Sequence, residues 1–366
     1  MLEQAGYKAL FVGGCVRNSL LGVPVADIDL ATDAVPQRVL ELAEDAGIKA
    51  IPTGIDHGTV TLVVDAVPVE VTTFRRDVAT DGRRAVVAFS QDVFEDAQRR
   101  DFTMNALYCD RTGRVLDPLG GLPDLEARRL RFVGEARDRV AEDYLRILRF
   151  FRFHAYYGGD GMDAVALDAC AWGAEGLNRV SAERIGSEML KLLAAPDPTP
   201  SLAAMVHTGV LPRVLPGARA EGVGPLVHLY PVTDAILRLA ALGGQDPDTK
   251  LRLSRVEAQR LEAIVSAAAS SAELEELAYR YGAKDGLAAL ALRLSGLESP
   301  MPADAEARAQ AASEAVFPIK ARDLMPALSG AALGAQLKSL EEDWIASGFS
   351  LSRKELMARV ETPDLP

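Results

Sequence analysis

The chain has few cysteines and histidines and no long apolar run, and these absences exclude several classes of protein. Three widely spaced cysteines, Cys15, Cys109 and Cys170, form neither a disulfide framework nor a zinc-binding pattern, which favours a reducing cytoplasm. No stretch of about 18 apolar residues occurs, so no membrane span is expected. The first residues lack the basic and then apolar pattern of a signal peptide. The four histidines are scattered, without the His-Asp pair of metal-dependent phosphohydrolases.

The chain also has too little positive charge for a general nucleic-acid binder, because its net charge is −12. Its 366 residues, 49% hydrophobic and 25% charged, are typical of a globular protein. This length predicts roughly two to four domains. One segment departs from the acidic average, since residues 128–152 hold eight arginines against four acids. That local excess predicts a phosphate-bearing ligand bound at one place.

Two familiar phosphate-binding patterns, Gly-x-Gly-x-x-Gly and Gly-Lys-Ser/Thr, are absent, and a different one takes their place. Gly13, Gly14 and Arg17 precede a pair of aspartates, Asp27 and Asp29. Residues two apart in a strand point to one face, and two adjacent carboxylates repel each other unless a cation lies between them. Such oxygens suit Mg²⁺, which keeps positions open for phosphate. Asp-x-Asp alone is common on exposed strand edges, but with the glycine turn upstream it predicts phosphoryl or nucleotidyl transfer.

Two further clusters allow both a chemical and a structural interpretation. Glu70 lies in an apolar strand, where it is either a general base beside the aspartates or a solvent-facing residue of a half-buried strand. Arg100, Asp101 and Asn105 could bind phosphate and ribose. They could equally form a capped helix with a solvated basic turn.

A third cluster follows the arginine-rich segment. Asp143, Arg146, Arg149 and Arg152 recur every three residues, which places them along one helical stripe. The alternative is pairing of Glu142 with Arg146, worth about 0.2–0.5 kcal/mol. The excess of arginine over acid on that stripe favours binding of an anionic ligand.

The hydrophobic pattern predicts an α+β protein. Strands are expected at 8–12, 27–30, 59–64 and 67–74, the last two forming a hairpin, with helices at 16–21 and at 36–46 after an Asp33 cap. Residues 77–90 are predicted to be a mobile loop, and a helix is expected to start within 101–107. Helices at 140–157 and 181–193 and an all-helical remainder follow. We expect a catalytic head at 1–125, a neck at 126–195, a body at 196–300 and a tail at 301–366.

Together these motifs resemble the class II tRNA nucleotidyltransferases, the family of bacterial CCA-adding enzymes and poly(A) polymerases. The family's Gly-Gly-x-Val-Arg-Asp is similar to residues 13–18, with Asn18 in place of the commoner Asp. Its metal pair matches Asp27 and Asp29, and its Glu-Asp-x-x-Arg-x-x-Arg motif matches residues 142–149. Its later Arg-x-x-x-Glu-Arg helix start matches residues 179–184.

The resemblance implies an N-terminal palm domain like that of polymerase beta, with a mixed sheet, and a helical C-terminal region that binds tRNA. It implies Mg²⁺ as cofactor, tRNA, ATP and CTP as partners, and addition of CMP, CMP and AMP to tRNA without a template. The implied catalytic residues are Asp27, Asp29 and Glu70, with Asp27 and Asp29 on the metal. The implied nucleotide-binding residues are Gly14, Arg17, Arg100, Asp101, Asn105, Asp143, Arg146, Arg149 and Arg152.

A carboxylate beside a guanidinium explains how such a site would choose its nucleotide. Cytosine and adenine each present an amino donor beside a ring acceptor, whereas uracil and guanine present a carbonyl beside an N–H. Asp143 and Arg146 complement the first pattern, and each mispaired polar group would cost about 1–3 kcal/mol.

Two alternatives remain open. One is a poly(A) polymerase of the same family, although residues 53–61 resemble the CCA-adding version and the Gly-Arg-Arg-Phe of the poly(A) enzymes is absent. The other is a catalytically inactive RNA-binding protein. The retained carboxylates Asp27, Asp29, Glu70 and Asp143 argue against it.

Overall fold

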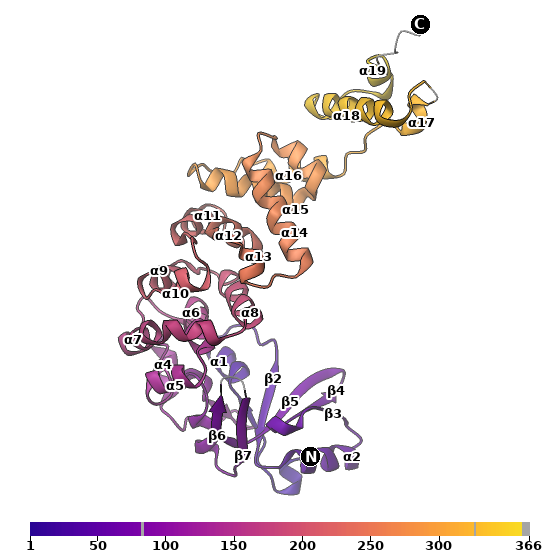
Figure 1. The fold of residues 1–366 in the computed structure, drawn as a ribbon. Coiled ribbons are helices and arrows are strands. Elements are labelled where there is room, and N and C mark those ends of the chain that lie inside the picture. Colours follow the sequence, from indigo (N-terminus) through magenta and orange to yellow (C-terminus); the bar gives the residue numbers. More distant parts are fainter. Residues whose placement is uncertain (82–83, 326, 361–366) are drawn as a thin grey trace. The chain divides into compact units, whose positions relative to one another are not determined.

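The strands that the structure describes all lie in the first third of the chain. The computed structural model describes residues 1–81, 84–325 and 327–360, and gives the backbone alone for those described between 77 and 86. Within these ranges no strand follows β9 (Val115–Leu116), and the later elements are helices (Figure 1). In the same ranges no helix combines the length and the apolar character needed to cross a lipid bilayer. The expected α+β class is confirmed.

The chain folds as two compact units. The first consists of Met1–Ala218 together with Gln245–Arg252, and the second of Arg219–Gly244 together with Leu253–Pro366. The chain therefore leaves the first unit, returns for eight residues and leaves again. The finer division into head, neck, body and tail stays a prediction.

A seven-stranded mixed sheet forms the N-terminal part of the first unit, in the order β3-β4-β5-β2-β1-β8-β9. Strands β2 and β5 are parallel, and the other neighbours are antiparallel. The bounds are β1 Leu10–Val12, β2 Ile28–Thr32, β3 Lys49–Gly54, β4 Thr59–Val64, β5 Val67–Thr73, β8 Tyr108–Cys109 and β9 Val115–Leu116. The predicted hairpin is confirmed, and positive φ angles at Asp65 (49°) and Ala66 (64°) form its two-residue turn.

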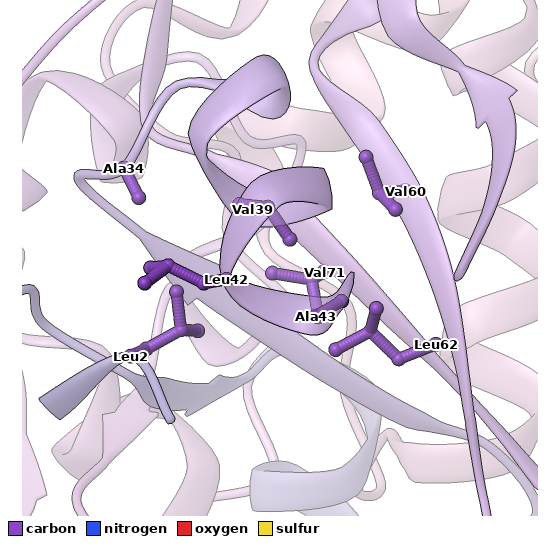
Figure 2. Close-up of a cluster of buried hydrophobic side chains, with 8 residues drawn as sticks. All are labelled: Leu2, Ala34, Val39, Leu42, Ala43, Val60, Leu62 and Val71. Atoms are coloured by element: carbon purple, nitrogen blue, oxygen red, sulfur yellow. The ribbon is translucent and has the colours of Figure 1, made fainter. Parts of the chain in front are cut away.

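Helix α2 (Pro36–Asp45) covers one face of this sheet. Its apolar stripe packs on side chains of β4 and β5 in a buried cluster (Figure 2), formed by Leu2, Ala34, Val39, Leu42, Ala43, Val60, Leu62 and Val71. The expected Asp33 cap is wrong, because Val35 is the N-cap residue and Asp33 instead accepts the backbone N–H of Lys8 at 2.7 Å. A second cluster lies on the opposite face, with Leu10, Val12, Ala31, Phe74 and Tyr108.

Residues predicted to form a mobile loop are paired as a two-stranded ribbon, β6 (Arg75–Asp81) with β7 (Arg84–Phe89). The charged residues of this segment obscured a β-prone run, Ala85-Val86-Val87-Ala88-Phe89. Residues 82 and 83, part of that predicted loop, lie outside the described residues. At the base of the ribbon the Phe74 carbonyl accepts from the Ser90 N–H at 2.7 Å, and the Phe74 N–H donates to the Thr32 carbonyl at 2.6 Å. The ribbon is thus fixed to the end of β2.

The helix expected at 140–157 breaks at Asp143, which has extended backbone angles (φ −153°, ψ 104°). Its carboxylate accepts from the Leu145 N–H at 3.1 Å, as a helix-capping side chain does. The helix start expected at 101–107 is a single 3₁₀ turn at Thr103–Asn105. The remaining helices of the first unit are α1 Gly14–Leu21, α3 Val93–Gln98, α4 Gly121–Glu126, α5 Ala136–Glu142, α6 Leu145–Tyr157, α7 Ala164–Gly173, α8 Ala182–Leu193, α9 Thr199–His207, α10 Val210–Val214 and α13 Pro247–Lys250.

The second unit is helical throughout its described residues. Its helices are α11 Val223–Leu229, α12 Ala235–Leu242, α14 Arg255–Ala269, α15 Leu274–Ser295, α16 Ala305–Ser313, α17 Ala321–Leu324, α18 Gly330–Ala346 and α19 Arg353–Met357. An ion pair in this unit joins Arg260 to Asp234, the N-cap residue of α12, at 2.6 Å. The three cysteines are free, as expected.

Candidate active site

Three carboxylates lie on one face of the sheet, where β2 and β5 run side by side. Asp29 is the register partner of Glu70, and their neighbours Leu30 and Val71 pack toward α2. Because side chains alternate along a strand, Asp29 and Glu70 point to the opposite face. Asp27 precedes Asp29 by two residues, and both Asp27 and Glu70 are exposed. The structure therefore brings the three predicted catalytic residues together.

Partial burial, and then the neighbouring carboxylates Glu70 and Asp27, raise the pKa of Asp29. Arg100 opposes this shift. Within the described residues no group of three or more His, Cys, Asp or Glu side chains is arranged to hold a metal ion by itself. An open row of carboxylates is what a hard cation needs when phosphate and water supply its other ligands.

A glycine turn lies between this carboxylate face and α1. Gly13 has φ 71°, in the left-handed region, and its N–H donates to the Leu107 carbonyl at 3.1 Å. A Cβ on Gly13 would lie 3.4 Å from Nη1 of Arg100. The turn and the first N–H groups of α1, which starts at Gly14, therefore lie beside a guanidinium, an arrangement suited to an anion.

Arg17 is held by neutral groups inside the protein. Its guanidinium donates to the Asn18 side chain at 2.9 Å, to the Tyr157 hydroxyl at 2.9 Å and to Asn105. It also stacks on the Tyr157 ring, 3.9 Å from the centroid. Burial lowers the pKa of Arg17. Asn18 thus supplies a hydrogen-bond acceptor, and Arg17 joins α1 to the end of α6.

Asp101 connects the predicted ribose residues to the predicted base-reading helix. One of its oxygens accepts from Asn105 at 3.0 Å and from its neighbour's N–H at 2.9 Å. The other accepts from Arg149 of α6 at 2.9 Å. Although burial opposes ionisation, the charge of Arg149 and these hydrogen bonds lower the pKa of Asp101 to about 2.

We expect Asp101→Asn to destabilise the protein by about 2 kcal/mol at pH 7, since the pKa falls from 3.8 to about 2 on folding. A folded-state pKa below the unfolded one means that this stabilisation is present above pH ~4 and is lost as pH falls toward 2. Urea unfolding of wild type and variant at pH 7 and at lower pH measures the difference. A difference that does not shrink on acidification would contradict the ionised pair.

Asp143 and Arg146, predicted to act side by side, contact other partners. Asp143 accepts two hydrogen bonds from Arg184 of α8, at 2.6 and 3.2 Å. Arg146 donates to Glu142 at 2.5 Å and to the Arg139 carbonyl at 2.9 Å. The prediction that Asp143 shares one helical stripe with the three arginines is therefore wrong, because the chain turns at Asp143. The alternative pairing of Glu142 with Arg146 is present.

The arginine excess of residues 128–152 is largely balanced by carboxylates from elsewhere in the first unit. Arg152 of α6 donates to Glu188 of α8 at 2.6 Å, and Arg149 lies 3.9 Å from the same carboxylate. The other acids that pair with this segment are Asp101, Asp124 and Asp168. A charge sum over neighbours in sequence therefore overstated the local positive field.

Several residues of this network were not predicted from the sequence. Asp96 of α3 accepts hydrogen bonds from both Arg99 and Arg100. Tyr157 accepts a hydrogen bond from Arg17, and Glu188 accepts one from Arg152. Asp96 had a local signal, since an acid three and four residues before two arginines suits helical pairing. Glu188 and Tyr157 had none, because their partners are distant in sequence.

Two family models match the chain. The model described as "Poly A polymerase head domain" matches residues 9–131, which contain the sheet and the carboxylate row. The model described as "Probable RNA and SrmB- binding site of polymerase A" matches residues 165–221.

Curated relatives and solved structures agree with these models. The chain is 32% identical over 399 residues to the mitochondrial CCA tRNA nucleotidyltransferase 1 of Mus musculus, covering 99% of this chain and 88% of that protein. It is 41% identical over 230 residues to a CCA-adding enzyme of Streptococcus pyogenes, a match that covers 62% of this chain and 56% of that protein. Its fold is similar to the crystal structure of the Bacillus stearothermophilus CCA-adding enzyme in complex with CTP, with a TM-score of 0.79 and 28% identity. The similarity covers 98% of this chain and 94% of that chain.

The mouse relative is matched over nearly the whole chain, and the Bacillus structure is similar over the same span. The matched region includes the carboxylate row, the glycine turn and helices α5, α6 and α8 described above. The chain therefore belongs to the class II CCA-adding tRNA nucleotidyltransferases.

Proposed function

We propose that this protein adds CMP, CMP and AMP to the 3′ end of tRNA, using CTP and ATP and no nucleic-acid template. The observation that supports this best is the row of Asp27, Asp29 and Glu70 on one sheet face, beside the glycine turn of α1. The names of the relatives supply the substrate class. We place the reaction in the cytoplasm, which suits three free cysteines.

Enzymes of this family work with a divalent metal ion, and we propose Mg²⁺ held by Asp27 and Asp29. The raised pKa of Asp29 beside two carboxylates supports this, because a cation would relieve their repulsion. Bound there, Mg²⁺ would neutralise charge on the α-phosphate. Glu70, exposed beside Asp29, is placed to accept the proton of the attacking hydroxyl.

The residues around the row have separate roles in this proposal. The first N–H groups of α1, beginning at Gly14, and the Arg100 guanidinium bind the triphosphate. Arg17, Asp101 and Asn105 form the polar wall against which the ribose lies, and Arg149 fixes that wall by binding Asp101.

Asp143 and Arg146 read the base in this proposal, and Arg152 supports the helix that carries Arg146. With Arg184 on its carboxylate, Asp143 is already oriented, so it can accept the amino group of cytosine or adenine. Arg146 would have to leave Glu142 or share its donors to reach the ring nitrogen. A guanidinium has five N–H donors, so sharing is feasible.

The deciding assay uses purified protein, Mg²⁺ and tRNA that ends before its CCA, with each labelled nucleotide in turn. We expect CTP alone to add two residues, ATP to add one residue after them, and UTP and GTP to be poor substrates. Long A-tracts would instead identify a poly(A) polymerase, and binding without extension an inactive RNA-binding protein. A second tRNA that already ends in CC separates the two steps.

The ribbon β6–β7 is proposed to serve the change from CTP to ATP, because its base is fixed to β2 and to the segment before Arg100. We expect a ribbon shortened by one residue pair at its tip to lose A addition more than C addition. Initial rates on the two tRNAs measure this. Equal loss of both steps would remove the reason for assigning the ribbon a switching role.

A further inference from the structure

Asp96 is a buried carboxylate that accepts hydrogen bonds from four different residues. Its side chain is only 1% exposed. Oδ1 accepts from Arg99 at 2.7 and 2.9 Å and from the backbone N–H of Arg75 at 3.4 Å. Oδ2 accepts from Arg100 at 3.0 and 3.3 Å and from the Tyr108 hydroxyl at 2.6 Å. This one acid of α3 therefore fixes groups from the segment directly after α3, from β6 and from β8.

The orientation of Arg100 follows from these contacts. Its Nε and Nη2 both face Asp96, which turns the remaining nitrogen, Nη1, toward Gly13. The guanidinium also lies 5.3 Å from the centre of the Tyr108 ring. Tyr108 is the register partner of Val12, the residue before the glycine turn. Asp96 and Tyr108 thus hold Arg100 on two sides.

The charges are unequal. Asp96 carries one negative charge for two guanidiniums, so the cluster keeps a net positive charge inside the protein. That charge lies beside the glycine turn, where Nη1 of Arg100 is directed.

We propose that Asp96 is a positioning residue for nucleotide binding: it holds Arg100 so that Nη1 faces the glycine turn and the triphosphate. This rests on the proposed function, in which Arg100 binds that triphosphate. In this proposal Asp96 acts on the nucleotide only through Arg100. Its contact with the Arg75 N–H also ties the orientation of Arg100 to the base of the β6–β7 ribbon.

The test is Asp96→Asn, assayed for CTP on tRNA lacking CCA and for ATP on tRNA ending in CC. Losing charge-assisted hydrogen bonds should raise KM for both nucleotides by about tenfold, with a smaller change in kcat. KM for tRNA should stay at the wild-type value. A purely structural role predicts the reverse, a reduced active fraction with unchanged KM, and that result would overturn the proposal.

Two further variants make the test robust. Asp234→Asn removes a carboxylate that is 8% exposed from an ion pair with Arg260 in the second unit, and should lower stability without changing the nucleotide KM. If Asp96→Asn does not fold, Tyr108→Phe removes one donor from the same oxygen and should raise KM for CTP and ATP together. An unchanged KM in folded Tyr108→Phe would then count against the proposal.

A double-mutant cycle separates this proposal from the proposed function. In an Arg100→Lys background, Asp96→Asn should raise the nucleotide KM by a smaller factor than it does in the wild type, because both changes remove the same oriented guanidinium. Additive effects would overturn the positioning role while leaving the proposed activity intact. Wild-type protein that adds no CMP would instead refute the proposed function.

Discussion

Replacing Asp27 or Asp29 with alanine should abolish nucleotide addition while leaving tRNA binding largely intact. Each change removes one of two proposed cation ligands, and the several kcal/mol of charge stabilisation lost corresponds to a rate loss of about a thousandfold or more. Glu70→Ala should be severe but less complete. Single-turnover extension of tRNA ending in CC measures the rate, and filter binding measures the complex.

Stability gives this prediction an internal control. Partial burial and two carboxylate neighbours disfavour the ionised form of Asp29, so Asp29→Ala should fold at least as stably as wild type in the absence of metal. Asp45→Ala, an exposed carboxylate at the end of α2, should keep the wild-type rate. Wild-type rates in Asp27→Ala protein would refute the assignment of the carboxylate row.

The second large effect is expected in nucleotide choice. Asp143→Ala removes the acceptor that favours an amino group over a carbonyl, so UTP and GTP should be misincorporated more often. The ratio of kcat/KM for CTP to that for UTP should fall by about tenfold or more, as expected for mispaired groups worth about 1–3 kcal/mol each. Because Arg184 orients Asp143, Arg184→Gln should move the ratio in the same direction.

The competing explanation is that Asp143 only caps α6 and pairs with α8. That explanation predicts lower stability with unchanged selectivity. Asp163→Ala is a matched control, since Asp163 caps α7 by accepting the Ala166 N–H at 3.0 Å. A CTP to UTP ratio equal to that of wild type in folded Asp143→Ala protein would end the base-reading assignment.

Local patterns in the sequence predicted four strands of the seven-stranded sheet and the carboxylate row, but they did not predict β3, β8 or β9. Alternating β-branched residues define β4 and β5, and Asp27 and Asp29 share a face because a strand repeats every two residues. The pairing of Asp29 with Glu70 could not be predicted, because it depends on β2 and β5 lying parallel after an intervening helix and two strands.

Partner choice among the arginines was the hardest part to predict. Arg146 and Arg184 both could have bound Asp143, and the turn between α5 and α6 decides for Arg184, 41 residues away. The ribbon at 75–89 was missed for a different reason, because the charged residues of this segment outweighed the β-prone run beside them. The first error came from a contact that only the folded chain makes, and the second from giving local charge more weight than β-propensity.

The short return of the chain at Gln245–Arg252 limits how this protein can be divided into fragments. A Cβ on Gly186 would lie only 1.8 Å from the Leu251 carbonyl oxygen, so α8 rests directly on this returning backbone. The same helix carries Arg184 and Glu188, which hold Asp143 and Arg152. A fragment that ends at Ala218 would strip α8 of this support. The smallest independent catalytic piece is therefore expected to reach Arg252 and to carry residues 219–244 as an insertion.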